Sequence, residues 1–190
     1  EKYVIIVSIL LVVALVQGVG LFLGFNHFWD FFYVSQNSFQ DDISVSLAIQ
    51  AFGTFLEGNY HPLTLLSHSL DYTFWRDDPF GHHLSSYFIH LANVFLVFLI
   101  IERLFSKNCR SRLYVCGLTA LIFGLHPLRV ESVVWITERK DVLFGFFYLL
   151  ALISYIFWRF QKKKLLYVLS LLFFICSSLS KAISVSFPLV

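Results

Sequence analysis

Long apolar stretches alternate with polar segments along this chain of 190 residues. A helix needs about 20 mainly apolar residues to cross a bilayer. Five stretches reach or approach that length, at residues 3–25, 84–104, 113–125, 142–160 and 165–179. The third and fifth are short, so we expect them to include residues from their flanks. The pattern predicts an all-α, polytopic membrane bundle with about five transmembrane helices, in a single domain over residues 1–190.

The segment between the first two spans, residues 26–83, is too long and too aromatic to be a plain connector. Ordered loops of this length are usually functional. Apolar residues recur at helical spacing over 43–56 and again over 63–75. His61-Pro62 suits the start of the second helix, because proline is favoured in the first turn. We therefore expect this first loop to contain helices that lie at the membrane interface.

The link between the third and fourth spans reads HPLRVESVVWITERKD (126–141) and mixes apolar with charged residues. At 100° per residue, Glu131, Trp135 and Glu138 fall on one side of a helix, while three valines and Thr137 fall on another. This spacing predicts a short amphipathic helix on the membrane surface, with its acids toward an aqueous cavity. Inside the second span, His90 is expected to bond to a neighbouring helix.

Composition agrees with a membrane protein. Hydrophobic residues make up 58% of the chain and charged residues 14%, whereas soluble domains are about 25% charged. The three cysteines lack the spacing of a disulfide framework or a zinc site. The lysines at 162–164 follow a span directly, so we interpret them as a membrane anchor and expect no nucleic-acid partner.

The distribution of charge predicts an orientation. Ten of the twelve acids lie in segments 26–83 and 126–141. Lysines and arginines are concentrated instead just after the second and fourth spans. Loops rich in these residues face the cytoplasm in membrane proteins. We therefore expect the first terminus to be cytoplasmic and the acidic segments to lie on the outer side. The cations concerned are Arg103, Lys107, Arg110, Arg112, Arg159, Lys162, Lys163 and Lys164.

Three stretches of the sequence read NYHPLTLLSHSLDY with PFGHHL (59–72, 79–84), LIFGLHPLRVESVVWITERKDVL (121–143) and LSKAISVSFP (179–188). Together they resemble the membrane part of bacterial proteins that join a polytopic glycosyltransferase domain to tetratricopeptide repeats. They are also similar, more distantly, to the transmembrane-and-tetratricopeptide O-mannosyltransferases of animals, which belong to the same C-type glycosyltransferase (GT-C) superfamily.

The resemblance implies transfer of a sugar from a polyprenyl-phosphate donor to a polypeptide or glycan hydroxyl on the outer face of the membrane. It also implies that the chain is the first part of a larger protein with further spans and tetratricopeptide repeats. The setting would be a bacterial inner membrane, or the endoplasmic reticulum in a eukaryote. Membrane lipids and other membrane subunits would be its partners. No metal site is predicted, although some members of the superfamily use a divalent cation.

The family has an acidic pair just after its first span. Here Asp30 matches one acid, Phe31 stands where the second is expected, and the pair Asp41-Asp42 lies further along. Sugar transfer needs a base near the acceptor and cations near the departing phosphate, so Asp30 is the predicted base. The predicted phosphate-side residues are His61, Arg129, Arg139 and Lys181, and the predicted positioning residues are His126, Glu131 and Asp141.

Simpler interpretations stand beside these. Arg139, Asp141 and Lys181 could be interfacial anchors at helix ends, and the departure at Phe31 favours a catalytically inactive scaffold subunit. A transporter is disfavoured, because its intramembrane ionisable groups would mark a path through the spans. An enzyme is expected to bring Asp30, Arg139 and Lys181 to one outer cavity, whereas a scaffold is not.

Overall fold

The computed structural model describes residues 1–25, 29–35, 44–56, 58–105 and 111–183. Within these ranges the regular elements are all helices, as the sequence predicts. In order they are α1 (Lys2–Gln17), η1 (Gly18–Phe22), α2 (Trp29–Ser35), α3 (Val45–Gly53), α4 (Pro62–Trp75), α5 (Pro79–Leu104), α6 (Arg112–Leu125), α7 (Pro127–Val134), η2 (Ile136–Glu138), α8 (Arg139–Gln161) and α9 (Lys164–Ser180).

Three helical stretches of the described chain are long and apolar enough to cross a membrane: Lys2–Phe22, Pro79–Leu104 and Ile136–Gln161. A fourth is reached only if α6 and α7, which meet at a bend of 57°, count as one span. The remaining apolar helix, α9, has 17 residues. The membrane assignment is thus supported, while the number of five spans stays a prediction.

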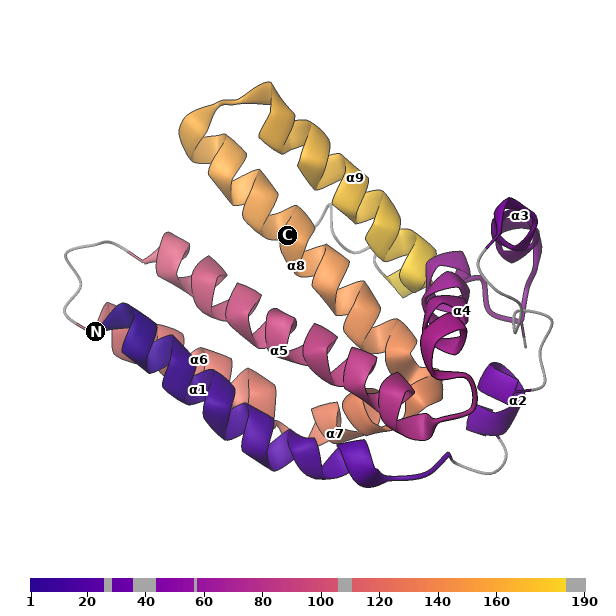
Figure 1. Ribbon diagram of the computed structural model, residues 1–190. Coiled ribbons are helices and arrows are strands. Elements are labelled where there is room, and N and C mark those ends of the chain that lie inside the picture. The colour runs from indigo at the N-terminus through magenta and orange to yellow at the C-terminus, as the bar shows by residue number, and fades with distance from the viewer. Residues whose placement is uncertain (26–28, 36–43, 57, 106–110, 184–190) are drawn as a thin grey trace.

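The long helices lie side by side and the short ones gather at one end of them (Figure 1). Helix α6 packs against α1 and α5, α5 packs against α8, and α8 packs against α9. The N-terminus and the turn between α8 and α9 lie at the other end. The end that carries α2, α3, α4 and α7 is the one that the charge distribution predicts to face outward.

Apolar packing joins α1, α5 and α6 around Val13, Val94 and Phe98, each 0% exposed. Gly124 permits this close approach, because a Cβ there would lie 2.6 Å from a methyl group of Val13. Polar bonds also link the helices, and the prediction for His90 is confirmed: its Nε2 lies 3.1 Å from the carbonyl oxygen of Gly124.

The prediction that Pro62 opens a helix is confirmed, and two more helices also begin at proline. Pro62, Pro79 and Pro127 each occupy the first turn of a helix, where the missing N–H costs nothing. Asp78 caps α5 by accepting a hydrogen bond from Phe80 N at 3.1 Å. As a result α5 begins five residues earlier than the apolar pattern indicates.

The segment 126–141 differs from its prediction in one respect. Helix α7 ends at Val134, and Trp135 is extended, with φ −83° and ψ 113°. A 3-10 turn then leads into α8. Glu138 therefore does not share a helical face with Glu131; it pairs instead with Lys140 at 2.8 Å.

Candidate functional site

Asp30 lies in the first turn of α2 and is 2% exposed. Its Oδ1 accepts hydrogen bonds from the backbone N–H of Thr137 at 2.9 Å and from its hydroxyl at 2.6 Å. These bonds fix the carboxylate against η2, at the start of the third candidate span. Thr137 was expected on an apolar side of a helix, so its role here was missed by the sequence pattern.

A hollow of about 500 Å³ opens beside Asp30. Glu131 and Trp135 also line it, and the indole Nε1–H of Trp135 is buried without a hydrogen-bond partner among the described residues. Two carboxylates and an available N–H donor suit recognition of a hydroxyl-bearing molecule. The other lining residues are Leu23, Gly24, Phe25, Val130 and Val134.

Arg139 is 0% exposed and its guanidinium is fully engaged. Its Nη1 lies 2.5 Å from Asp71 Oδ2, and its Nε donates a hydrogen bond to Ser86 Oγ at 3.1 Å. Two carbonyl oxygens, of Ser67 at 3.2 Å and of His82 at 2.6 Å, accept further bonds from it. Among the described residues, neither Glu131 nor Asp141 is a partner of this arginine, and their positioning roles stay predictions.

Asp71 is the acid that sequence reasoning missed. It lies on α4 with Thr64 and His68, and all three are buried. Their spacing of four and three residues is that of one helical face. A purely polar face of this kind would have been a signal of a buried polar contact. With Asp71 as its counter-ion and no exposed surface, Arg139 is poorly placed to bind a substrate phosphate.

Two histidines of α4 and its N-cap, His68 and His61, are buried and uncharged at neutral pH. Burial, assisted by the charge of Lys140, lowers the pKa of His61 from 6.5 to about 4. Burial also lowers the pKa of His68 well below its usual value, assisted by Arg139. The His61 ring stacks on Tyr33, with centroids 6.0 Å apart. A neutral, buried ring cannot supply positive charge to a phosphate, which argues against that prediction for His61.

The remaining predicted residues gather on the other side of α7. A hollow of about 420 Å³ is lined by His126, Arg129 and Asp141, together with Ser132 and three apolar side chains. Lys181 forms an ion pair with Asp141, which also accepts from Ser132 Oγ at 3.4 Å. The apolar lining consists of Ile122, Phe123 and Leu128.

The structure thus divides the predicted site residues into three groups. Asp30 and Glu131 share one hollow, Arg139 is enclosed by α4 and α5, and Lys181 joins Arg129, His126 and Asp141. The hollow beside Asp30 is lined by neither Arg139 nor Lys181, and the hollow beside Arg129 is lined by neither Asp30 nor Arg139. The side chain of Phe31 and the pair Asp41-Asp42 lie outside what the structure describes. In the same described part of the chain, no three His, Cys, Asp or Glu side chains are placed to hold a metal ion.

Comparison with known proteins bears directly on the resemblance. The chain is 35% identical over 97 residues to protein O-mannosyl-transferase tmtc2 of Xenopus laevis, an overlap of 51% of this chain and 11% of that protein. It is 33% identical over 97 residues to human protein O-mannosyl-transferase TMTC3, covering 51% and 10%. Tmtc1 of Drosophila melanogaster is 36% identical over 98 residues, covering 52% and 11%. The resemblance to the animal O-mannosyl-transferases is confirmed.

The similarity extends over half of this chain, and that half corresponds to about a tenth of the length of each relative. No protein-family model matches the chain, and no solved structure matches it.

Proposed function

We propose that this chain is part of a membrane glycosyltransferase that moves a hexose from a polyprenyl-phosphate donor to a hydroxyl group of a polypeptide or glycan on the outer face of the membrane. The observation that supports it best is the similarity to several proteins named protein O-mannosyl-transferases. These names favour mannose as the sugar. They also favour an enzyme over the alternative of an inactive scaffold subunit, whereas the separation of Asp30, Arg139 and Lys181 is the arrangement that the scaffold alternative expects.

The hollow beside Arg129 suits the phosphate of the donor. His126 and Arg129 are exposed and line it, and Lys181 is held next to it by Asp141. Arginine binds phosphate through paired N–H donors. Leu128 is 79% exposed and Ile122 is 56% exposed at the same hollow, so the polyprenyl chain could leave the phosphate directly into lipid.

The hollow beside Asp30 suits the acceptor. Asp30 would take the proton of the acceptor hydroxyl as its oxygen attacks the anomeric carbon of the donor. The bond between that carbon and the phosphate oxygen then breaks, and the electron pair leaves with the polyprenyl phosphate, whose charge Arg129 and Lys181 stabilise. Asp141 lies on the phosphate side, but its ion pair assigns it to holding Lys181.

Helix α7 lies between the two hollows, with Ser132 lining one and Glu131 the other. Transfer requires the reacting atoms to be about 3–3.5 Å apart. The proposal therefore requires α7 to shift when both substrates bind. The bend at its start and the extended residue Trp135 at its end are the places where such a shift would occur.

The test is transfer of radiolabelled mannose from a polyprenyl-phosphate mannose to acceptor peptides, in membranes that contain the whole protein. Asp30→Asn should reduce the rate by about 10²-fold or more, the loss typical of a missing general base. Arg129→Gln should raise KM for the donor. Asp77→Asn, at an exposed acid of the same outer segment, is the matched control and should keep full activity.

The outcomes separate the two parts of the proposal. Full activity of Asp30→Asn would remove the base assignment while leaving the enzyme intact. Absence of transfer by the unmodified protein, across mannose and other hexose donors, would overturn the enzyme itself and restore the scaffold alternative.

A further inference from the structure

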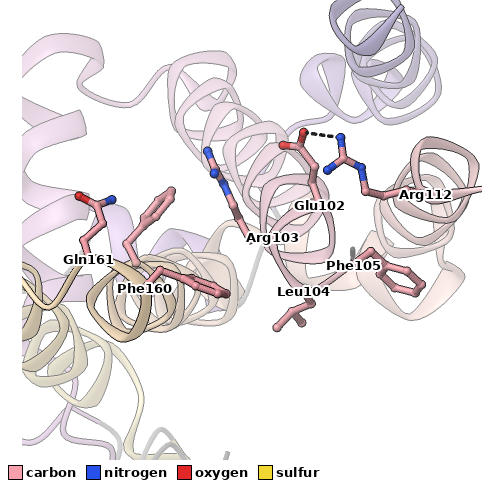
Figure 2. A pocket seen from close by; sticks show the side chains of 8 residues that line it. Glu102, Arg103, Leu104, Phe105, Arg112, Phe160 and Gln161 are labelled. Atoms are coloured by element: carbon pink, nitrogen blue, oxygen red, sulfur yellow. Dashed lines mark ion pairs between the residues drawn. The ribbon is translucent and has the colours of Figure 1, made fainter. Parts of the chain in front are cut away.

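A third hollow with a polar lining lies at the opposite end of the bundle from Asp30. It has a volume of about 730 Å³ and is formed where α5 and α8 end and α6 begins (Figure 2). Its lining combines charged, polar and aromatic side chains: Glu102, Arg103, Leu104, Phe105, Arg112, Phe157, Phe160 and Gln161. None of these residues belongs to the proposed transfer site.

The only acid in this lining is neutralised by its own neighbours. Glu102 is 8% exposed, and its carboxylate receives Lys2 Nζ at 2.6 Å and Arg112 Nη2 at 3.6 Å. The dashed line in Figure 2 marks the ion pair between Glu102 and Arg112. Two cations therefore surround one buried carboxylate, which leaves the cluster with a net positive charge.

Arg103 adds a further cation to the same hollow. Its guanidinium lies over the ring of Phe157, 4.8 Å from the centroid. In the view of Figure 2 it stands between the Glu102–Arg112 pair and Phe160. Among the ion pairs of the described residues, none joins Arg103 to a carboxylate. Within the described residues, its charge therefore adds to that of Lys2 and Arg112 at this hollow.

The rim of the hollow is apolar and exposed. Leu104 is 62% exposed, Phe105 40% and Phe160 70%. All three lie at the ends of candidate membrane spans, where side chains meet the boundary between lipid tails and headgroups. A ligand that fills this site would therefore need an anionic group for the arginines and hydrocarbon for the rim.

We propose that this hollow binds the phosphate of an anionic phospholipid from the adjacent leaflet. Basic pockets between transmembrane helices on the cytoplasmic side are suited to anionic lipid headgroups. The charge distribution predicts that this end faces the cytoplasm, because the cations after α5 and α8 gather there. A soluble phosphate would use the arginines alone and gain nothing from the exposed Leu104, Phe105 and Phe160.

The experiment measures lipid retained by the purified whole protein. The protein is reconstituted in nanodiscs of phosphatidylcholine with a minor fraction of phosphatidylglycerol. It is then released from the nanodiscs at low activation energy in a native mass spectrometer, which identifies the lipids that stay bound. Arg103→Gln keeps a polar side chain of similar length but removes the charge. Arg159→Gln is the matched control, because Arg159 is an exposed arginine near the end of α8 that does not line the hollow.

The unmodified protein should retain phosphatidylglycerol in preference to phosphatidylcholine. Arg103→Gln should weaken that preference by about tenfold or more, the effect of losing one charge-assisted hydrogen bond to the phosphate. Arg159→Gln should weaken it by no more than about fivefold, the effect of one basic residue near a membrane surface. Equal losses in both variants would show diffuse attraction and overturn the site. Displacement of the lipid by millimolar inorganic phosphate would also overturn it, in favour of a soluble phosphate. The result is independent of whether Asp30→Asn loses transfer.

Discussion

Replacing Asp71 by asparagine should destabilise the protein by about 3–5 kcal/mol, because the change leaves the charge of a buried arginine without its counter-ion. Arg139 is 0% exposed, and Asp71 is its only carboxylate partner among the described ion pairs. Asparagine keeps the shape of the side chain and can still accept the hydrogen bond that Ser85 Oγ donates to Asp71 Oδ1 at 2.7 Å. The change therefore removes charge and little else.

The assay is thermal unfolding of the purified protein, followed by intrinsic fluorescence in one detergent at neutral pH. For a domain of this size the expected loss corresponds to a fall in Tm of about 10 °C. Asp77→Asn removes an exposed acid two residues after α4 ends and should change stability by no more than about 0.5 kcal/mol.

A double variant tests the cause. Arg139→Gln alone leaves Asp71 buried without its counter-ion, whereas Asp71→Asn with Arg139→Gln removes both charges. The double variant should therefore be more stable than the sum of the two single losses predicts, by about 0.5–3 kcal/mol. Simple additivity, or a loss under about 1 kcal/mol for Asp71→Asn alone, would refute the interpretation of the pair as a buried, mutually dependent contact.

Two further predictions concern the outer helices. Acidification from pH 6.5 to 4 should destabilise the protein by about 3 kcal/mol through His61 alone, because the His61 ring is protonated near pH 6.5 in the unfolded chain but only near pH 4 in the folded chain. The Tm of His61→Asn should therefore fall less steeply between these pH values than the Tm of the unmodified protein. Parallel curves of Tm against pH would contradict the assignment. Gly81→Ala should destabilise the folded protein by about 1–3 kcal/mol through overpacking, because the new Cβ would lie 2.0 Å from Cγ of Trp75. Adding Trp75→Leu to this variant should restore the Tm if that contact is the cause. An unchanged Tm in Gly81→Ala would contradict the prediction.

The positions of the helices were largely contained in the sequence. Apolar runs of about 20 residues have one stable arrangement in lipid, which is a helix with its backbone bonds satisfied internally. Pro62 correctly predicted where α4 begins, and the fourth apolar run starts within three residues of α8. The three quoted stretches also sufficed to identify the O-mannosyl-transferase relatives, before any contact was known.

The partners of the charged residues were decided only by the tertiary structure. Helical spacing determines which residues share a face, but it does not determine which faces meet. Asp71 and Arg139 are 68 positions apart, and they pair because α4 packs beside the start of α8. The extended residue Trp135, which interrupts a segment predicted to be one helix, likewise separates Glu131 from the residues that follow. The local sequence pattern could indicate on which segment each carboxylate and each cation lies. Whether such a residue becomes a buried counter-ion or stays accessible to a ligand depended on how helices far apart in the sequence pack together.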